Sequence, residues 1–330
     1  MKLMKGLRHL KAPSGGSIVT IGVFDGVHRG HARVIDAAVK RARALGVKSI
    51  VVTFDPHPAK VVRPSSKVPS LISLDHRIRL IGDMTPDILI VLSFTKAFAA
   101  LTDKEFAGKI LAAKAGAKEV YIGDNFYFGK HARSGARELR GLGERFGFKV
   151  HVVKALKMGR LRISSSLIRH LIKEGRLHDA ARFLGRPVSV LGTVVGGANL
   201  ARELGYPTAN LNPHHEVVPP SGVYAVLVRY KDRLYKGILN IGVRPTFYAS
   251  RDREPAIEVH IFGFNGDIYG KDLEVYFIRK IRQERQFKGQ ESLVRQIKKD
   301  EKAVLAILRS MDSDQHAKLA RSIIGASFVG

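Results

Sequence analysis

The sequence predicts two consecutive domains, a parallel α/β sheet followed by a small antiparallel β-barrel. The first observation is an alternation of short apolar runs with helical patterns from Ser17 to about Val153, which is typical of a parallel sheet covered by helices. The second is a change after Pro187 to strands separated by Gly, Pro and Asn, with few helical patterns before Gly289. The length of 330 residues suits two such domains.

In the first domain, strand-like runs end in polar turns. The apolar run 17–23 predicts a buried strand, and an amphipathic helix with Val34, Ile35 and Val39 on one face follows Gly30. Further strands are predicted in SIVVTFD, ILIVLSF, EVYIGDNF and KVHVV, and a helix in FAGKILAAKAG. Because ligands of a parallel sheet gather at the carboxyl ends of its strands, we expect the turns FDGVHRGH, FDPHP, SFTKAF and GDNFYFG to line one crevice.

The stretch RISSSLIRHLIKEGRLHDAARFLGRP marks the domain boundary. It predicts two short helices, with serines capping the first and Gly185 and Pro187 ending the second. Strands follow in VSVLGTVV, GVYAVLVRY, RLYKGILNIG, AIEVHIF and DLEVYFI, and a terminal helix in GQESLVRQIKKDEKAVLAIL. We therefore predict a first domain at 1–186, a barrel domain at 187–311 and a tail of unassigned role at 312–330.

The charge balance makes polyanions or phosphorylated small molecules the natural partners. The formal net charge is +27, but lysines and arginines are spread along the whole chain. That distribution favours a generally basic surface over a nucleic-acid groove, and no zinc-finger spacing or basic low-complexity arm is present. We expect small-molecule substrates and no nucleic-acid partner, and the sequence does not indicate an oligomeric state.

Two further features bear on the compartment. The chain has no cysteine, which excludes disulfides and thiolate metal sites and suits a reducing compartment. The first residues, MKLMKGLRHLK, lack the apolar core of a signal peptide, and no apolar run approaches the roughly 20 residues that cross a bilayer. We expect a soluble, cytoplasmic protein with no membrane partner.

The histidines His28 and His31 fall at the turn between the first strand and its helix. A helix N-terminus presents backbone N–H groups and a positive dipole end, so imidazoles placed there can reach a bound phosphate. A helix-capping turn with incidental histidines is the alternative for an isolated H-x-G-H pattern. The other motifs of the chain have to decide between the two.

An ordered series of motifs resembles the bacterial bifunctional riboflavin kinase/FAD synthetase family, from about Ser17 to Asp300. The motifs are FDGVHRGH, TFDPHP, FTKAFAALT, GDNFYFG and RISSSLIR, then LGYPTANL, GVYAV, NIGVRPTF, IEVHIF, GDIYGKDLEVYF and ERQF. The resemblance implies a Rossmann-like nucleotidyltransferase domain with a parallel sheet, then a six-stranded antiparallel β-barrel of the riboflavin kinase type with a terminal helix. It also implies phosphorylation of riboflavin to FMN and adenylylation of FMN to FAD with release of pyrophosphate, with ATP as the donor in both steps and Mg²⁺ as the metal.

For adenylyl transfer, the resemblance implies that His28 and His31 contact the ATP phosphates and are the catalytic residues. Asn125 would be a neutral hydrogen-bonding partner, and the stretch 162–169 would close over the triphosphate. Taken singly, the serines also suit helix caps, Asn125 a turn and Arg169 a solvated helix face. The complete expected set is Gly22, Phe24, Asp25, Gly26, His28, Gly30, His31, Asn125, Arg162, Ser165, Ser166 and Arg169.

For the kinase step, GYPTANL resembles the family's Mg-ATP clamp, in which Thr208 and Asn210 supply oxygen ligands to Mg²⁺. Glu258 corresponds to the general base. Alternation across AIEVHIF puts Glu258 and His260 on the face opposite Ile257 and Val259. An exposed strand carboxylate is the alternative for Glu258. The expected phosphate-binding residues are Gly197, Arg202, Gly205, Pro207, Thr208 and Asn210.

The chain departs from the family pattern in the glycine-rich loop GGANLAR. Ala201 stands where a second glycine is usual and Asn199 where glycine is common, whereas Arg202 is retained. Ser166 replaces a usual threonine and keeps the hydroxyl. Beside the bifunctional enzyme, two alternatives follow: an FAD synthetase with an impaired kinase domain, and an RNA-binding protein on a nucleotidyltransferase fold. Retention of both histidines, the serines and Glu258 argues against the RNA-binding alternative.

Overall fold

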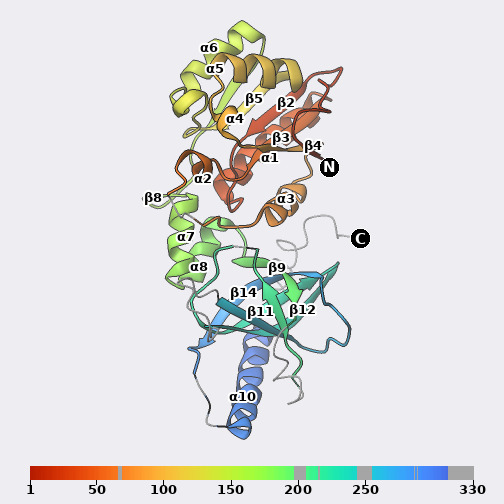
Figure 1. Ribbon diagram of the computed structural model, residues 1–330, viewed down its shortest axis with the longest axis vertical. Coiled ribbons are helices and arrows are strands. Elements are labelled where there is room, and N and C mark those ends of the chain that lie inside the picture. Colours follow the sequence, from red (N-terminus) through yellow and green to blue (C-terminus); the bar gives the residue numbers. More distant parts are fainter. Residues whose placement is uncertain are drawn as a thin grey trace. The chain divides into compact units, whose positions relative to one another are not determined.

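The computed structural model describes residues 1–65, 69–196, 206–214, 216–243, 255–285, 287 and 289–310 (Figure 1). The chain divides into two compact units, Met1–Ser70 with Leu74–Ser165, and Leu71–Ser73 with Ser166–Gly330. The two predicted boundary helices are present as α7 (Ser165–Lys173) and α8 (Leu177–Leu184), and Gly185 ends α8 with a φ of 81°. The compact units divide after Ser165, the first residue of α7, and the domain bounds 1–186 and 187–311 stay a prediction.

The first unit contains a six-stranded sheet in which every pairing is parallel, as the alternation predicts. The strand order is β1-β4-β3-β2-β5-β6. β1 was not expected from the alternation, and β2 ends two residues earlier than the apolar run 17–23. The strands are β1 (Lys2–Lys5), β2 (Ser17–Ile21), β3 (Lys48–Asp55), β4 (Ile88–Ser93), β5 (Ala117–Gly123) and β6 (Lys149–Val153).

Helical segments cover both faces of this sheet. Ile18 of β2 packs against Ala38 and Ala42 of α1, whereas Val19 and Ile21 belong to the core that includes residues of η1 and α6. The predicted helix FAGKILAAKAG forms η1, which is wound as a π-helix, and nothing in the sequence pattern indicated that winding. The segments are α1 (Arg29–Ala44), α2 (Pro58–Val62), α3 (Leu74–Gly82), α4 (Lys96–Ala99), α5 (Asp103–Glu105), η1 (Phe106–Lys114), η2 (Lys130–Ala132) and α6 (Ala136–Phe146), followed by the hairpin β7 (Lys157–Met158) and β8 (Leu161–Arg162).

An ionic cluster connects α1 to β5 and β6. The Arg41 guanidinium donates to both carboxylate oxygens of Glu119, at 2.7 to 3.1 Å. The Tyr121 hydroxyl donates to Glu119 at 3.2 Å, and His151 Nε2 lies 2.9 Å from the same carboxylate. The hydrogen bonds from Arg41 hold the pKa of the buried Glu119 carboxyl below its ordinary value. The cluster stabilises one face of the sheet only while Glu119 is ionised.

The second unit is a closed six-stranded antiparallel barrel with a terminal helix, as predicted. Its strand order is β10-β13-β12-β11-β14-β9, and β9 pairs with β10 to close it. Ala225 and Leu227 on the outer face form a core with Val304 and Leu308 of the terminal helix. The elements are β9 (Ser189–Val195), β10 (Ala209–Asn212), β11 (Gly222–Tyr230), β12 (Arg233–Val243), β13 (Pro255–Ile261), β14 (Asp272–Arg282) and α10 (Gln290–Arg309), and the tail lies outside the described residues.

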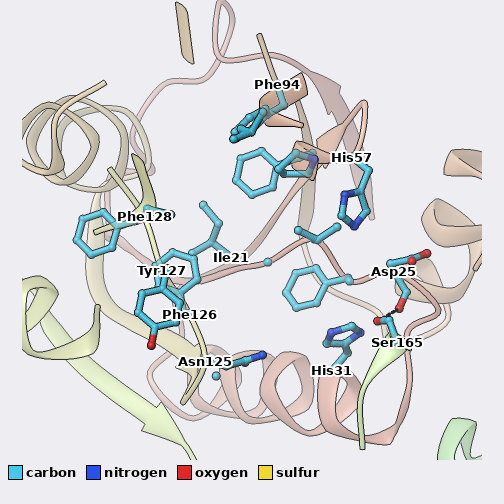
Figure 2. Close-up of a pocket in the computed structure, with 18 of the residues that line it drawn as sticks. Ile21, Asp25, His31, His57, Phe94, Asn125, Phe126, Tyr127, Phe128 and Ser165 are labelled. Atoms are coloured by element: carbon cyan, nitrogen blue, oxygen red, sulfur yellow. Dashed lines mark hydrogen bonds between the residues drawn. The ribbon is translucent and has the colours of Figure 1, made fainter. Parts of the chain in front are cut away.

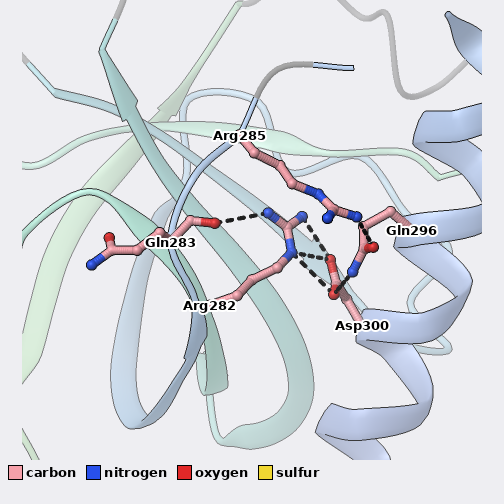
Figure 3. Close-up of polar contacts among 5 residues, drawn as sticks. All are labelled: Arg282, Gln283, Arg285, Gln296 and Asp300. Carbon is pink, nitrogen blue, oxygen red and sulfur yellow. Dashed lines mark hydrogen bonds and ion pairs between the residues drawn. The ribbon is translucent and has the colours of Figure 1, made fainter. Parts of the chain in front are cut away.

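A polar clamp fixes α10 to the end of β14 (Figure 3). The Arg282 guanidinium donates to both oxygens of Asp300, at 2.7 to 3.1 Å, and Asp300 is only 3% exposed. Gln296, one turn earlier on α10, donates to Asp300 and accepts from Arg285. The helix is therefore held by charged hydrogen bonds as well as by its apolar face.

In the part of the chain that the structure describes, no helix combines the length and apolar character needed to cross a bilayer.

Candidate functional site

A cavity of about 730 Å³ lies at the carboxyl ends of the parallel strands (Figure 2). Each of the four predicted turns contributes to its lining, for example through His31, His57, Phe94 and Asn125. The expected convergence of these turns on one crevice is therefore confirmed. Of the residues expected at the adenylyl-transfer site, the cavity is lined by Gly22, Phe24, Asp25, His28, Gly30, His31, Asn125, Arg162 and Ser165.

The remaining three expected residues are placed differently. Gly26 belongs to the first turn, where its φ is 83°, but it does not line the cavity. Ser166 and Arg169 lie on α7 within the second compact unit, and they are not among the lining residues of the first unit's cavity.

His28 is the N-cap of α1. Its Nδ1 accepts a hydrogen bond from the backbone N–H of His31 at 3.2 Å, so a neutral His28 carries its ring proton on Nε2. The rings of His28 and His31 stack, with centroids 3.6 Å apart. A Cβ on Gly30 would come within 3.2 Å of the His28 ring, which explains the glycine between them. The capping alternative is therefore correct for His28, and the same ring also lines the cavity.

The turn that carries these histidines is strained. Phe24 and Val27 have φ values of 52° and 37°, although neither is glycine and both are buried. The Phe24 ring meets the His31 ring edge-on, with centroids 5.4 Å apart. His31 therefore contacts an aromatic ring on one side and stacks with His28 on another.

Ser165 connects the second predicted signature to the first. Its hydroxyl donates to the backbone carbonyl of Asp25 at 2.8 Å, the contact drawn in Figure 2. Arg162, from the same signature, forms an ion pair of 2.6 Å with Asp124. The two stretches that the sequence separates by well over a hundred residues thus meet at one end of the cavity.

The lining is rich in positive charge. Two carboxylates, Asp25 and Asp124, line the cavity, whereas its cations are more numerous: Arg63, Lys96, Lys130, Lys154 and Arg162. Low-dielectric walls with one predominant sign of charge concentrate ligands of the opposite sign. The cavity is therefore suited to a ligand that carries several phosphate groups.

Several phenylalanines besides Phe24 line the cavity, and the sequence analysis assigned them no role. Phe54 contacts Phe94 and Phe98 with ring centroids 5.5 and 5.7 Å apart, and Phe126 stacks on Phe128 at 5.7 Å. Phe94 and Phe128 lie away from His31 in Figure 2. The repeated phenylalanines in FTKAF and GDNFYFG were the sequence feature from which this aromatic lining could have been predicted. Such a wall can hold a planar apolar ring beside the phosphate-binding end.

The barrel carries a second group of predicted residues. Glu258 on β13 is paired directly with Asn210 on β10 and with Asn240 on β12, so the three side chains share one face. Ile257 and Val259 are buried on the other face, which confirms the predicted alternation. The shared face is the outer one, because Ile238, two residues before Asn240, packs with the core formed by α10. Asn240 was missed because strand register is not visible in a local pattern.

The segment before β10 is attached to this face. His260 Nδ1 donates to the carbonyl of Pro207 at 2.7 Å, and its ring lies edge-on to Tyr206 at 5.6 Å. Thr208 follows directly in the chain, and the Asn210 side chain is almost fully buried. Of the other kinase residues expected from the sequence, Gly197, Arg202 and Gly205 lie outside the described residues, as do Asn199 and Ala201.

A further carboxylate, from the ERQF motif, lies near this row. A Cβ on Gly242 would clash with the Glu284 carboxylate and come within 3.4 Å of Asn240 Nδ2. Gly242 therefore leaves room for Glu284 close to Asn240. The outer face of the barrel thus gathers amide and carboxylate oxygens from four separate stretches of sequence, and oxygens of these kinds are the ligands that magnesium takes.

Comparisons with known proteins match each half of the chain to a family. The family model described as FAD synthetase matches residues 10–167, and that described as riboflavin kinase matches 184–308. The bifunctional riboflavin kinase/FMN adenylyltransferase of Pseudomonas fluorescens is 36% identical over 307 residues, covering 93% of this chain and 98% of that protein. The Bacillus subtilis protein of the same name is 34% identical over 299 residues, covering 90% and 94%. A solved structure described as a macrolide-efflux protein from Streptococcus pneumoniae aligns with a TM-score of 0.79 at 31% identity, covering 92% of this chain and 99% of that one.

Proposed function

This chain belongs to the bifunctional riboflavin kinase/FMN adenylyltransferase family, and on that premise we propose how its two reactions are divided between the two sites. The enzyme phosphorylates riboflavin to FMN and adenylylates FMN to FAD, with ATP as the donor in both steps. The cavity of the first unit carries adenylyl transfer, within the domain 1–186. The outer face of the barrel carries phosphorylation, within 187–311. The observation that carries the first assignment is one cavity that is lined both by stacked histidines and by phenylalanines.

In adenylyl transfer, an oxygen of the FMN phosphate attacks the α-phosphorus of ATP while the bond from that phosphorus to the bridging oxygen of pyrophosphate breaks. Negative charge grows on the α-phosphate and on the leaving group, so positioning and electrostatic stabilisation lower the barrier. His28, His31 and Asn125 supply hydrogen bonds at the phosphate end of the cavity, and the surrounding lysines and arginines balance the charge of pyrophosphate. The phenylalanine wall holds the flavin ring.

The other members of the expected set have supporting roles. The turn that carries the histidines is shaped by five of them: Gly22, Phe24, Asp25, Gly26 and Gly30. The second expected phosphate-binding signature contains Arg162, Ser165, Ser166 and Arg169. The hydrogen bond from Ser165 to the Asp25 carbonyl supports a place at the cavity for its first two members.

In the kinase step, the ribityl 5′-hydroxyl attacks the γ-phosphorus of a second ATP, and ADP leaves. Glu258 accepts the hydroxyl proton as general base. The Thr208 hydroxyl and the Asn210 amide oxygen fit Mg²⁺, which prefers hard oxygen ligands and keeps several waters. When bound there, Mg²⁺ would neutralise phosphate charge. Pro207 positions Thr208 through its contact with His260, and Gly197, Arg202 and Gly205 complete the phosphate-binding set.

The substrates are small molecules, and we place the enzyme in the cytoplasm without a nucleic-acid partner. The absence of cysteine from the sequence and the spread of its positive charge support this placement. Binding to total RNA that survives physiological salt in a filter assay would contradict it, because simple electrostatic attachment collapses with salt.

One assay tests whether the chain carries out both reactions. The purified chain is incubated with ATP and Mg²⁺ and either riboflavin or FMN, and the flavins are separated by chromatography. We expect FMN and then FAD from riboflavin, and FAD from FMN. Formation of FAD from FMN, with none from riboflavin, would identify an FAD synthetase with an impaired kinase domain. Failure of both reactions would refute the functions assigned to the two sites.

A further inference from the structure

Arg77 of α3 is an almost completely buried cation, and no sequence motif indicated a role for it. Its side chain does not line the cavity, and the residue is 5% exposed. Its Nη1 donates to the backbone carbonyl of Val23 at 2.7 Å, and the Thr53 hydroxyl donates to the same carbonyl at 3.0 Å. Two donors from separate elements therefore fix one carbonyl of the turn that carries the histidines.

This carbonyl belongs to the peptide that leads into Phe24. Because the Val23 carbonyl and the Phe24 nitrogen share one peptide plane, holding the carbonyl restrains the φ of Phe24, which is 52°. A non-glycine residue in that region costs about 1 to 3 kcal/mol and persists only when its surroundings hold it. The Phe24 ring contacts His31, and His31 stacks on His28. A chain of contacts thus runs from Arg77 to both histidines.

The burial of Arg77 is costly, which argues against a role in packing alone. Desolvation lowers the pKa of its guanidinium, and the charges of Asp25 and Asp55 act in the opposite direction. Asp55 lies at 4.0 Å, and among the described residues no hydrogen-bond partner of Arg77 Nε is found. An apolar side chain of similar volume would fill the space at less cost. The guanidinium is explained if the Val23 carbonyl has to be held.

We propose that Arg77 is a positioning residue for adenylyl transfer, which keeps Phe24 in its left-handed conformation and thereby holds His31 against His28. This inference rests on the assignment of the cavity as the adenylyl-transfer site. Arg77 touches no substrate and acts on the reaction through the Val23 carbonyl.

The experiment uses the full chain and measures FAD formation from FMN and ATP. Arg77→Gln should lower kcat about 10- to 100-fold, because small misplacements of a catalytic group have effects of this size. The KM for ATP should change by no more than about twofold, because the cationic lining remains. Arg77→Lys should recover most of kcat, since its ammonium group can donate to the same carbonyl. Arg79→Gln removes an equal charge from the same helix and should leave kcat unchanged.

Three further measurements keep the outcome decisive. Riboflavin phosphorylation by each variant, a reaction of the other domain, should stay at the original rate, and denaturant unfolding of each variant reports whether the first domain is folded. If Arg77→Gln does not fold, Thr53→Val removes the second donor to Val23 and should lower kcat several-fold. Unchanged kcat in both Arg77→Gln and Thr53→Val, or in Thr53→Val alone where the other variant is unfolded, overturns the proposal. An equal decrease of kcat in Arg77→Gln and Arg77→Lys also overturns it.

His31→Ala, measured in parallel, separates this inference from the site assignment. If His31→Ala still forms FAD at the original rate, the cavity is not the adenylyl-transfer site. If His31→Ala is inactive while Arg77→Gln and Thr53→Val both keep their kcat, the cavity assignment stands and only the role of Arg77 is refuted.

Discussion

Glu258 of β13 stands directly opposite Asn210 of β10 and, on its other side, opposite Asn240 of β12. The closed antiparallel register therefore brings the expected base, an expected metal ligand and a second amide into one row on the outer face of the barrel. These residues are far apart in the sequence. Their shared face supports a single site for proton transfer and magnesium binding.

Glu258→Gln should separate the two activities. The amide cannot accept the hydroxyl proton, so riboflavin phosphorylation should slow by about a hundredfold to ten-thousandfold. FAD formation from supplied FMN should continue at the original rate. Both rates can be read from one chromatographic assay, with Glu291→Gln, an exposed carboxylate on α10, as the matched control. Kinase turnover close to the original rate would remove Glu258 from the role of base.

Substitutions at His28 can separate helix capping from chemistry. His28→Asn retains a short acceptor for the His31 N–H and should keep the free energy of unfolding, whereas His28→Ala should lower it by about 1 kcal/mol. Both variants, and His31→Ala, should block FAD formation from FMN and leave riboflavin phosphorylation intact. Denaturant unfolding measures the first effect and the flavin assay the second. An active His28→Asn enzyme would reduce His28 to a helix cap.

The Arg41–Glu119 pair predicts a loss of stability in acid. The folded-state pKa of Glu119 lies below its ordinary value of 4.5, chiefly because of the hydrogen bonds from Arg41. Its contribution to stability is therefore complete above pH 4.5 and disappears as the pH falls through the lowered pKa. Hydrogen exchange of the β5 and β6 amides should report this loss, and Glu119→Gln should remove this pH dependence. An unaltered pH profile in Glu119→Gln would assign the acid sensitivity to other carboxyls.

Asp300→Ala should loosen α10 from the barrel. The substitution leaves the Arg282 guanidinium without its carboxylate, and loss of such charged hydrogen bonds costs about 2 kcal/mol. Urea unfolding followed by a probe on α10 should show the change. The double variant Arg282→Met, Asp300→Leu should recover part of the stability, because an apolar pair leaves no buried charge unpaired. Equal stability of Asp300→Ala and the original chain would show that the apolar face of α10 suffices.

Local sequence patterns predicted the elements and several site residues, because each depended on neighbours in the chain. The period of two in AIEVHIF placed Glu258, and the strand-to-helix turn placed His28 and His31 at the cavity. Asn240 and Arg77 were not predictable in the same way. Asn240 reaches the site through the register between β12 and β13. Arg77 acts through a hydrogen bond to Val23, 54 positions away in the sequence. Neither relationship leaves a local periodic signal.

The surplus of lysine and arginine around the first cavity has a kinetic consequence. Charges at the mouth of a cleft act on an anion before contact, over a Debye length of about 8 Å at physiological ionic strength. On the proposed assignment of this cavity, we therefore expect the encounter with ATP to be faster in dilute salt. Because pyrophosphate would be attracted by the same field, we expect its release to be slower under the conditions that speed the arrival of ATP. We therefore expect the rate of FAD formation to depend on the salt content of the surrounding solution.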